Sequence, residues 1–221
     1  MNEKIKVINL DFVNAYLIGT PYGYILIDSG MAFQWEKLDG ELASAGCVPG
    51  NLKLVIVTHG DMDHIGNCAR LREKYHARIA MHQADSFMAE TGVPVKRKIR
   101  TFSAKMRFMF MRLMRKISGK KFSFEKFKPD ILLTEGQSLA EYGFDAKILH
   151  IPGHTKGSIA VLTADGDLFA GDTLNNTSRP EIAIIIENQG ELESSIDRLK
   201  KMNIKTVYPG HGKPFPMESM R

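Results

Sequence analysis

Four side chains of metal-binding type lie within six positions of this chain. They follow the apolar run at residues 54–57, and Gly60 separates the first from the second. The four residues are His59, Asp61, Asp63 and His64. Neutral imidazole and carboxylate oxygen are ligands that zinc and similar divalent cations take. A solvated turn is the alternative for this segment alone, because His-Gly-Asp is also typical of turns.

Three further residues of ligand type follow short apolar runs later in the chain. His154 comes after residues 146–151, Asp172 after residues 168–170, and His211 after residues 206–208. A glycine precedes each of them, and glycine lets backbone loops approach one another closely. Four such strand ends favour a metal centre over unrelated turns. We therefore expect a metalloenzyme.

The order of these residues resembles the metallo-β-lactamase superfamily. Its pattern is His-x-His-x-Asp-His, followed by a lone His, a lone Asp and a lone His. Residues 14–18, 25–30 and 209–212 also look like landmarks of that family, so the resemblance covers nearly the whole chain. It implies an α+β fold, an αββα sandwich, in a single domain over residues 1–221. One position departs from the pattern, since Asp61 stands where the family has its second His.

The resemblance also implies a ligand set and an activity. The first metal would be held by His59, Asp61 and His154, the second by Asp63, His64 and His211, with Asp172 bridging them. We expect a dinuclear metal-dependent hydrolase, in which a metal-bridging hydroxide attacks an ester, thioester or lactone. Asp63 and Asp172 are the expected catalytic carboxylates. Phosphodiester hydrolysis of the nuclease type is the alternative reaction.

Asp61 affects both the metal and the reaction. An extra carboxylate lowers the positive charge of the site and shifts its preference toward harder ions. We expect two divalent ions, zinc first, with manganese or iron as alternatives. A carboxylate here also resembles the flavodiiron branch, so a di-iron redox protein with a separate electron donor is an alternative. A non-catalytic binding module is a third, although the other six ligand positions are all filled.

Residues 95–128 differ in composition from the rest of the chain. They contain thirteen Lys or Arg and one acid, Glu125, whereas the whole chain has a net charge of +5. Apolar residues from 99 to 117 recur at helical spacing, with several Met among them. We expect a basic, Met-rich helical insertion that acts as a lid and contacts a small-molecule substrate, acyl or aromatic, with a negative group. Simple docking on the domain, a membrane surface and nucleic acid are alternatives.

Length and composition agree with one large core. The chain has 221 residues, 43% of them hydrophobic, and two cysteines, which provide no disulfide framework. Its first residues include no long uncharged apolar stretch, so we expect a cytoplasmic protein. No pattern specifies an oligomeric state.

Three residues near the ligands are expected to support them. Asp28 is expected to order the following turn or to support a metal-binding His through its second ring nitrogen, and Thr58 and Thr155 are expected to hydrogen-bond the ligand loops.

Hydrophobic periodicity predicts the elements that position the ligands. Strands are predicted at 5–10, 13–18, 24–28, 54–58, 78–81, 146–151, 158–163, 168–170, 182–186 and 205–208. Helices are predicted at 32–46, 66–76 and 190–202.

Overall fold

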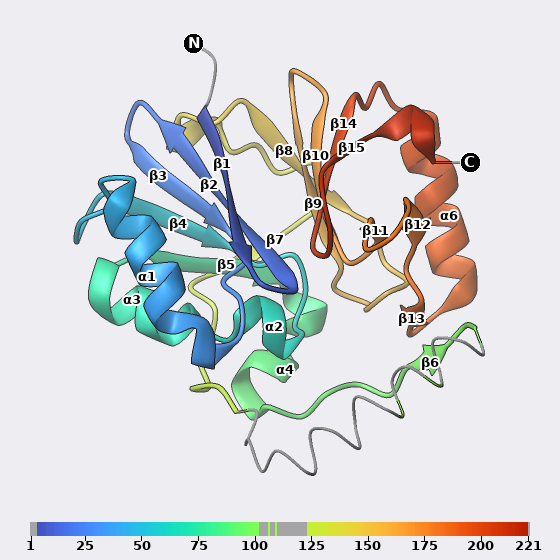
Figure 1. Cartoon of the computed structure of the whole chain (residues 1–221), viewed down its shortest axis with the longest axis horizontal. Coiled ribbons are helices and arrows are strands. Elements are labelled where there is room, and N and C mark those ends of the chain that lie inside the picture. The colour runs from blue at the N-terminus through green and yellow to red at the C-terminus, as the bar shows by residue number, and fades with distance from the viewer. Residues whose placement is uncertain (1–3, 102–105, 107–108, 110–122, 221) are drawn as a thin grey trace.

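Two β-sheets pack face to face, and helices cover their outer faces (Figure 1). The computed structural model describes residues 4–101, 106, 109 and 123–220. In order across the first sheet, the strands are β1 (Lys4–Leu10), β2 (Val13–Thr20), β3 (Gly23–Ile27), β4 (Leu52–Ile56), β5 (Arg78–His82) and β7 (Ile131–Leu133). The second sheet contains β15 (Phe215–Pro216), β14 (Thr206–Pro209), β10 (Asp167–Gly171), β9 (Ile159–Thr163) and β8 (Ala146–His150).

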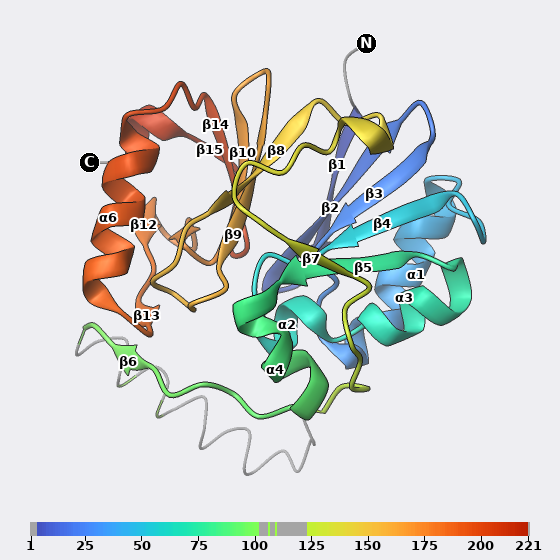
Figure 2. The same ribbon diagram turned by 180° about the vertical axis from the view of Figure 1, so that it is seen from behind.

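The helices lie on opposite sides of this pair of sheets, as Figure 2 shows from behind. Next to the first sheet are the 3-10 turn η1 (Ala32–Gln34), α1 (Trp35–Ser44), α2 (Met62–Ile65), α3 (Cys68–Tyr75) and α4 (Gln83–Thr91). Helix α6 (Gln189–Lys200) covers the second sheet. Two further 3-10 turns are η2 (Ala140–Tyr142) and η3 (Met217–Ser219).

Alternation along the strands divides the apolar side chains among three packed layers. In β3, Ile25 and Ile27 belong to the buried layer between the sheets, whereas Leu26 packs with residues of α1 and α3. In β9, Val161 lies in the layer between the sheets and Ala160 packs in the cluster that contains α6. Successive strand side chains point to opposite faces, so a strand covered on both sides is apolar throughout. The predicted αββα sandwich is confirmed.

The two sheets are joined at the edge where the ligand loops lie. Strands β3, β4, β5 and β7 run parallel, as do β10 and β14, so the loops that follow these strands lie at the same edge of each sheet. The Ile159 amide donates to the Thr58 carbonyl at 2.9 Å, and the Asn14 amide donates to the Gly210 carbonyl at 2.8 Å. These bonds connect loops from both sheets directly beside the candidate ligands.

The prediction of one strand at 182–186 was wrong. Two short strands occur there, β12 (Glu181–Ile182) and β13 (Ile185–Ile186), which pair with β11 (Leu174–Asn175) and β6 (Lys98–Ile99) respectively. Between them the Ala183 amide donates to Thr173, and the Ile184 carbonyl accepts from Arg100. The apolar run therefore changes partners midway, which periodicity does not reveal. Helix α4 and strand β7 were not predicted, because α4 is mostly polar and β7 has three residues.

Most of the predicted helical insertion lies outside the described residues. The apolar stripe from 99 to 117 falls largely on residues 102–105, 107–108 and 110–122, so the lid, and the division into one domain with an insertion, stay predictions. The described start of the segment includes β6, which pairs antiparallel with β13. Within the part of the chain that the structure describes, every helix is too short or too polar to cross a bilayer.

Candidate metal centre

All seven predicted ligands meet at one edge of the sandwich. They form two groups, and within each group the ligand atoms lie within 4.8 Å of one another. The first group is His59, Asp61, His154 and Asp172, and the second is Asp63, His64 and His211. The residues come from the loop after β4, from α2, and from the loops after β8, β10 and β14. Side chains from distant parts of the sequence are thus neighbours in space.

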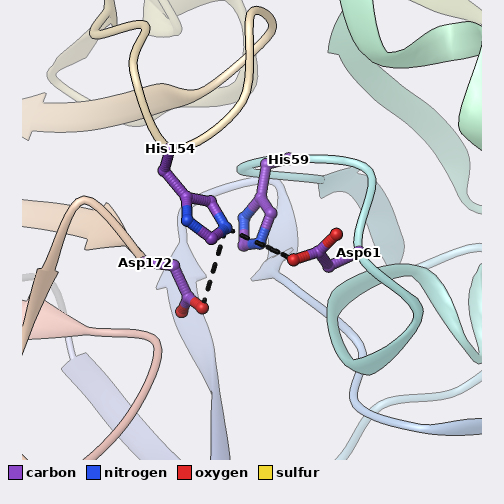
Figure 3. A group of neighbouring side chains, drawn as sticks. All are labelled: His59, Asp61, His154 and Asp172. Atoms are coloured by element: carbon purple, nitrogen blue, oxygen red, sulfur yellow. Dashed lines mark hydrogen bonds and ion pairs between the residues drawn. The ribbon is translucent and has the colours of Figure 1, made fainter. Parts of the chain in front are cut away.

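The first group has the spacing of ligands around one ion (Figure 3). Asp61 Oδ2 lies 3.4 Å from His59 Nε2 and 3.3 Å from His154 Nε2, and His154 Nε2 lies 3.8 Å from Asp172 Oδ2. Four ligands held tetrahedrally at 2.0–2.1 Å from a zinc ion would be roughly 3.4 Å apart. The side chains therefore already stand at about metal-ligand spacing.

Asp172 lies between the two groups. Its Oδ1 is 3.3 Å from His64 Nε2, and its Oδ2 is 3.2 Å from His211 Nε2 as well as near His154. Asp63 Oδ2 approaches the same His211 nitrogen at 3.4 Å. One carboxylate thus faces ligands of both groups, as a bridging ligand must.

The loop after β4 aims its side chains by local backbone geometry. Asp61 has an extended backbone and its carbonyl accepts from the amides of His64 and Ile65, which starts α2 directly after it. Its carboxylate makes no capping bond to the helix and is left to face the centre. A Cβ at position 60 would lie 2.4 Å from Met88 Cε, so a glycine there lets the ligand loop lie close to Met88 in α4.

Every imidazole of the centre is oriented through its Nδ1 atom. This nitrogen has a protein partner in each case, so the Nε2 atom faces the other ligands, an arrangement typical of metal-binding histidines. The pairs are His59 with Thr58 Oγ1 (3.0 Å), His64 with Asp28 Oδ2 (2.9 Å), His154 with the Ile185 carbonyl (2.7 Å) and His211 with the Phe12 carbonyl (2.6 Å). The predicted contacts of Asp28 and Thr58 are confirmed.

The inward-facing atoms fit divalent cations. His59 Nε2, His64 Nε2 and Asp172 Oδ1 are buried and have no hydrogen-bond partner among the described residues. Buried polar atoms are nearly always satisfied, so several unpaired ligand-type atoms in adjoining groups fit sites that bind cations. The three carboxylates and four imidazoles of the centre are also the donor types that zinc, manganese and iron bind.

The two carboxylates of the first group, both partly buried, are held as anions. Burial by itself raises the pKa of Asp61, but the hydrogen bond with His154, the nearby His59 imidazole and the charge of Arg97 lower it well below its usual range. Burial likewise raises the pKa of Asp172, and the charges of His211 and His64 more than offset this and lower it strongly. Both side chains are therefore ionised and available as ligands at neutral pH.

The pKa values of the histidines are shifted in opposite directions by their surroundings. Burial lowers the pKa of His64, but the charges of Asp28, Asp172 and Asp63 outweigh burial and raise it well above its usual value. The same competition raises the pKa of His211 to about 9. Burial and the neighbouring His64 lower the pKa of His59. The carboxylates that raise the pKa values of His64 and His211 would attract divalent cations in the same way.

Two residues at the centre were not predicted from the sequence. Asp85, in α4, is 1% exposed and accepts from the Gly60 amide, the Gly157 amide and the Thr155 hydroxyl, which ties the first ligand loop to the loop of His154. Arg97 forms an ion pair with Asp61. The sequence offered no signal for Arg97, since it is one of thirteen basic residues in its segment.

Comparison with known proteins agrees with this geometry. The chain is 30% identical over 127 residues to a hydroxyacylglutathione hydrolase (GloC) of Haemophilus influenzae, covering 56% of this chain and 50% of that protein. It is 24% identical over 236 residues to the probable metallo-hydrolase YflN of Bacillus subtilis, covering 98% and 85%. The solved structure of TTHA1623 in a di-iron-bound form matches with a TM-score of 0.68 and 25% identity, covering 94% and 91%.

The chain spans about half the length of several curated relatives that it matches, with 57%, 50% and 50% of three of them covered. The family profile described as "Metallo-beta-lactamase superfamily" matches residues 8–211. That range includes all seven residues of the centre and most of both sheets. The chain belongs to the metallo-beta-lactamase superfamily.

Proposed function

We propose that this protein is a dinuclear metal-dependent hydrolase that acts on an ester, thioester or lactone. The observation that supports it is the convergence of seven ligand side chains in two adjoining groups, with Asp172 between them. Four imidazoles present Nε2 to the centre because protein atoms hold their Nδ1. Such preparation for cations is costly unless cations bind, since it leaves buried polar atoms unpaired.

The side chains of the centre have two proposed roles, metal binding and proton transfer. His59, Asp61 and His154 would hold one ion, Asp63, His64 and His211 the other, and Asp172 both. Ions held by these residues would activate a water as the attacking hydroxide and polarise the scissile carbonyl. Asp63 is the most exposed carboxylate of the centre, with 21% of its side chain accessible, and it would accept the proton from that water. Asp28 fixes the ring of His64.

Relatives and ligand chemistry favour acyl hydrolysis and leave three metals to compare. Proteins named hydroxyacylglutathione hydrolase are among the relatives, as is a probable metallo-hydrolase. We expect zinc to be the preferred metal, because the ligand atoms of the first group have roughly the spacing of a tetrahedral zinc site. Iron is supported by the di-iron form of a relative that is 25% identical, and manganese by the carboxylate at Asp61.

The substrate is proposed to be a small molecule with an acyl or aromatic part and a negative group. The basic start of the 95–128 segment reaches the centre at Arg97, which pairs with Asp61, and the neighbouring Lys96 and Lys98 are exposed positive charges. A lid role for the remainder of the segment, and a cytoplasmic location, are part of the proposal. Contact of the segment with a membrane or nucleic acid remains the alternative.

A hydrolysis screen tests the proposal. The full chain, loaded separately with Zn²⁺, Mn²⁺ and Fe²⁺, is assayed on nitrophenyl esters, an acyl thioester, a lactone and a nitrophenyl phosphodiester. We expect turnover of at least one acyl substrate, and loss of about 10²-fold or more in His64→Ala and Asp172→Ala. His76→Asn is the control, because His76 is exposed, lies outside both ligand groups and has a left-handed φ of 58° that Asn tolerates. Phosphodiester turnover alone would contradict acyl specificity.

A further inference from the structure

Arg97 reaches into the first ligand group and contacts two of its ligands. Its Nη2 lies 2.5 Å from Asp61 Oδ1, and its Nη1 lies 2.5 Å from Asp61 Oδ2. The same Nη1 lies 3.2 Å from His154 Nε2. Only 13% of the Arg97 side chain and 16% of the Asp61 side chain are exposed. The guanidinium is therefore a built part of the centre.

The backbone around Arg97 is held by the segment that also positions His154. Strand β6 begins next to Arg97 and pairs with β13, and the Arg100 amide donates to the Ile184 carbonyl at 2.9 Å. The neighbouring Ile185 carbonyl is the partner of His154 Nδ1. Residues 184–186 thus fix the relative positions of the guanidinium and of one ligand imidazole.

The bidentate contact compensates for the residue that departs from the family pattern. A histidine at position 61 would be a neutral ligand, whereas Asp61 adds one negative charge. Arg97 is always protonated, so it adds one positive charge at contact distance from that carboxylate. The formal charge around the first ion is then the same as with a histidine. The planar guanidinium matches both carboxylate oxygens, which a lysine would not do.

We propose that Arg97 is a positioning residue of the first metal site that neutralises Asp61, so that the Asp61–Arg97 pair takes the place of a neutral histidine and limits how tightly the site binds a cation. This inference rests on the proposed function, because it assumes that Asp61 is a metal ligand. It concerns only this chain's own pair of side chains and does not depend on which substrate is hydrolysed.

The proposal is distinguished from simple structural support by the sign of the effect. A guanidinium shares the carboxylate with the cation and repels it, so removing Arg97 should tighten metal binding. If Arg97 only held Asp61 in place, removing it would release the carboxylate and weaken metal binding. The two roles therefore predict opposite changes in one measured affinity.

The test is a metal titration of the apo-form of the full chain with Zn²⁺ and, separately, Mn²⁺, by calorimetry and by competition with a chromophoric chelator. We expect Arg97→Met to bind the first-site ion about tenfold more tightly than wild type, as removal of one nearby charge at partial burial predicts. Arg97→Lys keeps the charge and should remain within about threefold of wild type. Lys98→Met, which removes an exposed charge one residue away, is the matched control and should leave the affinity within about twofold.

A double substitution completes the test. Asp61→His alone leaves Arg97 without its carboxylate beside a cation, and should weaken first-site binding about tenfold or more. Adding Arg97→Met to Asp61→His should restore an affinity near that of wild type, because the pair would again be neutral. Rescue of this kind is not expected from a residue that only supports the backbone.

Three results would overturn the inference. They are an Arg97→Met affinity that is unchanged or weaker, a double variant that binds no better than Asp61→His, or a Lys98→Met effect as large as that of Arg97→Met. In each case a wild-type protein that still binds two ions would leave the proposed function in place. A wild-type protein that binds no divalent cation would overturn both proposals at once.

Discussion

The orientation of each imidazole depends on a single partner at its Nδ1 atom. For His64 this partner is Asp28, which is 1% exposed and also accepts from the Thr58 amide and hydroxyl. The carboxylate fixes the ring and increases the basicity of Nε2. Partners of this type typically contribute about 10–100-fold to metal affinity.

Asp28→Asn should therefore weaken metal binding at the second site by about 10–100-fold, since a neutral amide stabilises the ligating form less. Metal titration of the apo-protein measures the effect. Asp39→Asn is the control, because Asp39 bonds Lys74 and Tyr75 at a distance from the ligands. Equal affinities for wild type and Asp28→Asn would show that the contact does not tune the site.

The two thiols are predicted to be unreactive in the folded protein. Burial raises the pKa of Cys47 to about 11 and that of Cys68 to about 12. Because the folded values exceed the unfolded ones, the thiols favour the folded state below about pH 8.5–9, roughly their unfolded pKa, and this contribution decreases as the pH rises toward about 11–12.

An aromatic disulfide reagent at about pH 8 should label native protein slowly and denatured protein at two thiols at once. Stability measured by urea unfolding should fall between about pH 9 and pH 11. Rapid labelling of the native protein would show that the thiols are neither buried nor held in the protonated form.

Residue types and spacing were sufficient to predict which seven side chains converge at the candidate centre, but not that Arg97 joins them. His59 to His64 are close in sequence, and His154, Asp172 and His211 each follow a strand beside a glycine. Arg97 resembles twelve other basic residues in its segment, and only the pairing of β6 with β13 brings it to Asp61. Local sequence therefore indicates which residues can bind a metal, while tertiary pairing decides which charge neutralises them.

At the scale of elements, close packing between ligand loops requires specific glycines. A Cβ at Gly210 would lie 2.4 Å from Asp172 Oδ1 and 2.8 Å from His64 Cε1. Its backbone is not in the left-handed region, so the conflict is with the ligands and not with its own φ. By contrast, a Cβ at Gly40 in α1 would have no atom of the described residues within 4 Å apart from its chain neighbours and the adjacent backbone of its own helix.

Gly210→Ala should displace the Asp172 carboxylate, weaken metal binding more than about tenfold and reduce stability by about 1–3 kcal/mol through overpacking. Gly40→Ala should instead raise stability by roughly 0.5–1 kcal/mol, because alanine favours a helix, and should leave metal binding unchanged. Urea unfolding and metal titration measure both variants. The interpretation fails if Gly210→Ala binds metal like wild type.

Hydrophobic periodicity predicted most elements because most strands are covered on one or both faces. The alternation in β3 and β9 assigns each residue to a layer, and helix α6 has an apolar stripe toward the second sheet. Prediction failed at 182–186, where the residues before Ala183 pair with β11 and the residues after it pair with β6. Such a change of partner depends on contacts distant in sequence, which a local pattern does not contain.

At the scale of the whole molecule, the candidate metal centre lies between the two halves of the sandwich. His59 and His64 follow a strand of the first sheet, whereas His154, Asp172 and His211 follow strands of the second. Ions bound between them would act as cross-links that exist only in the folded state. Ligands of the native state stabilise it by about 2.7 kcal/mol at a concentration about 100 times their Kd.

Removing metal should therefore lower the unfolding temperature by several degrees, and restoring it should reverse the change. Calorimetry of metal-loaded and chelator-treated protein provides the measurement. The Asp172→Ala variant should show little difference between the two forms, since its bridging ligand is lost. An unfolding temperature that is independent of metal in wild type would mean that the centre does not link the sheets.

The number of metal ions per chain is the most direct measurement of the central claim. Elemental analysis of protein purified without added metal, and again after equilibration with Zn²⁺ or Mn²⁺ and removal of excess, should find about two ions per chain. Asp172→Ala and His64→Ala should each retain fewer. Less than one ion per wild-type chain after equilibration, or two ions retained in both variants, would contradict a dinuclear centre built from these residues.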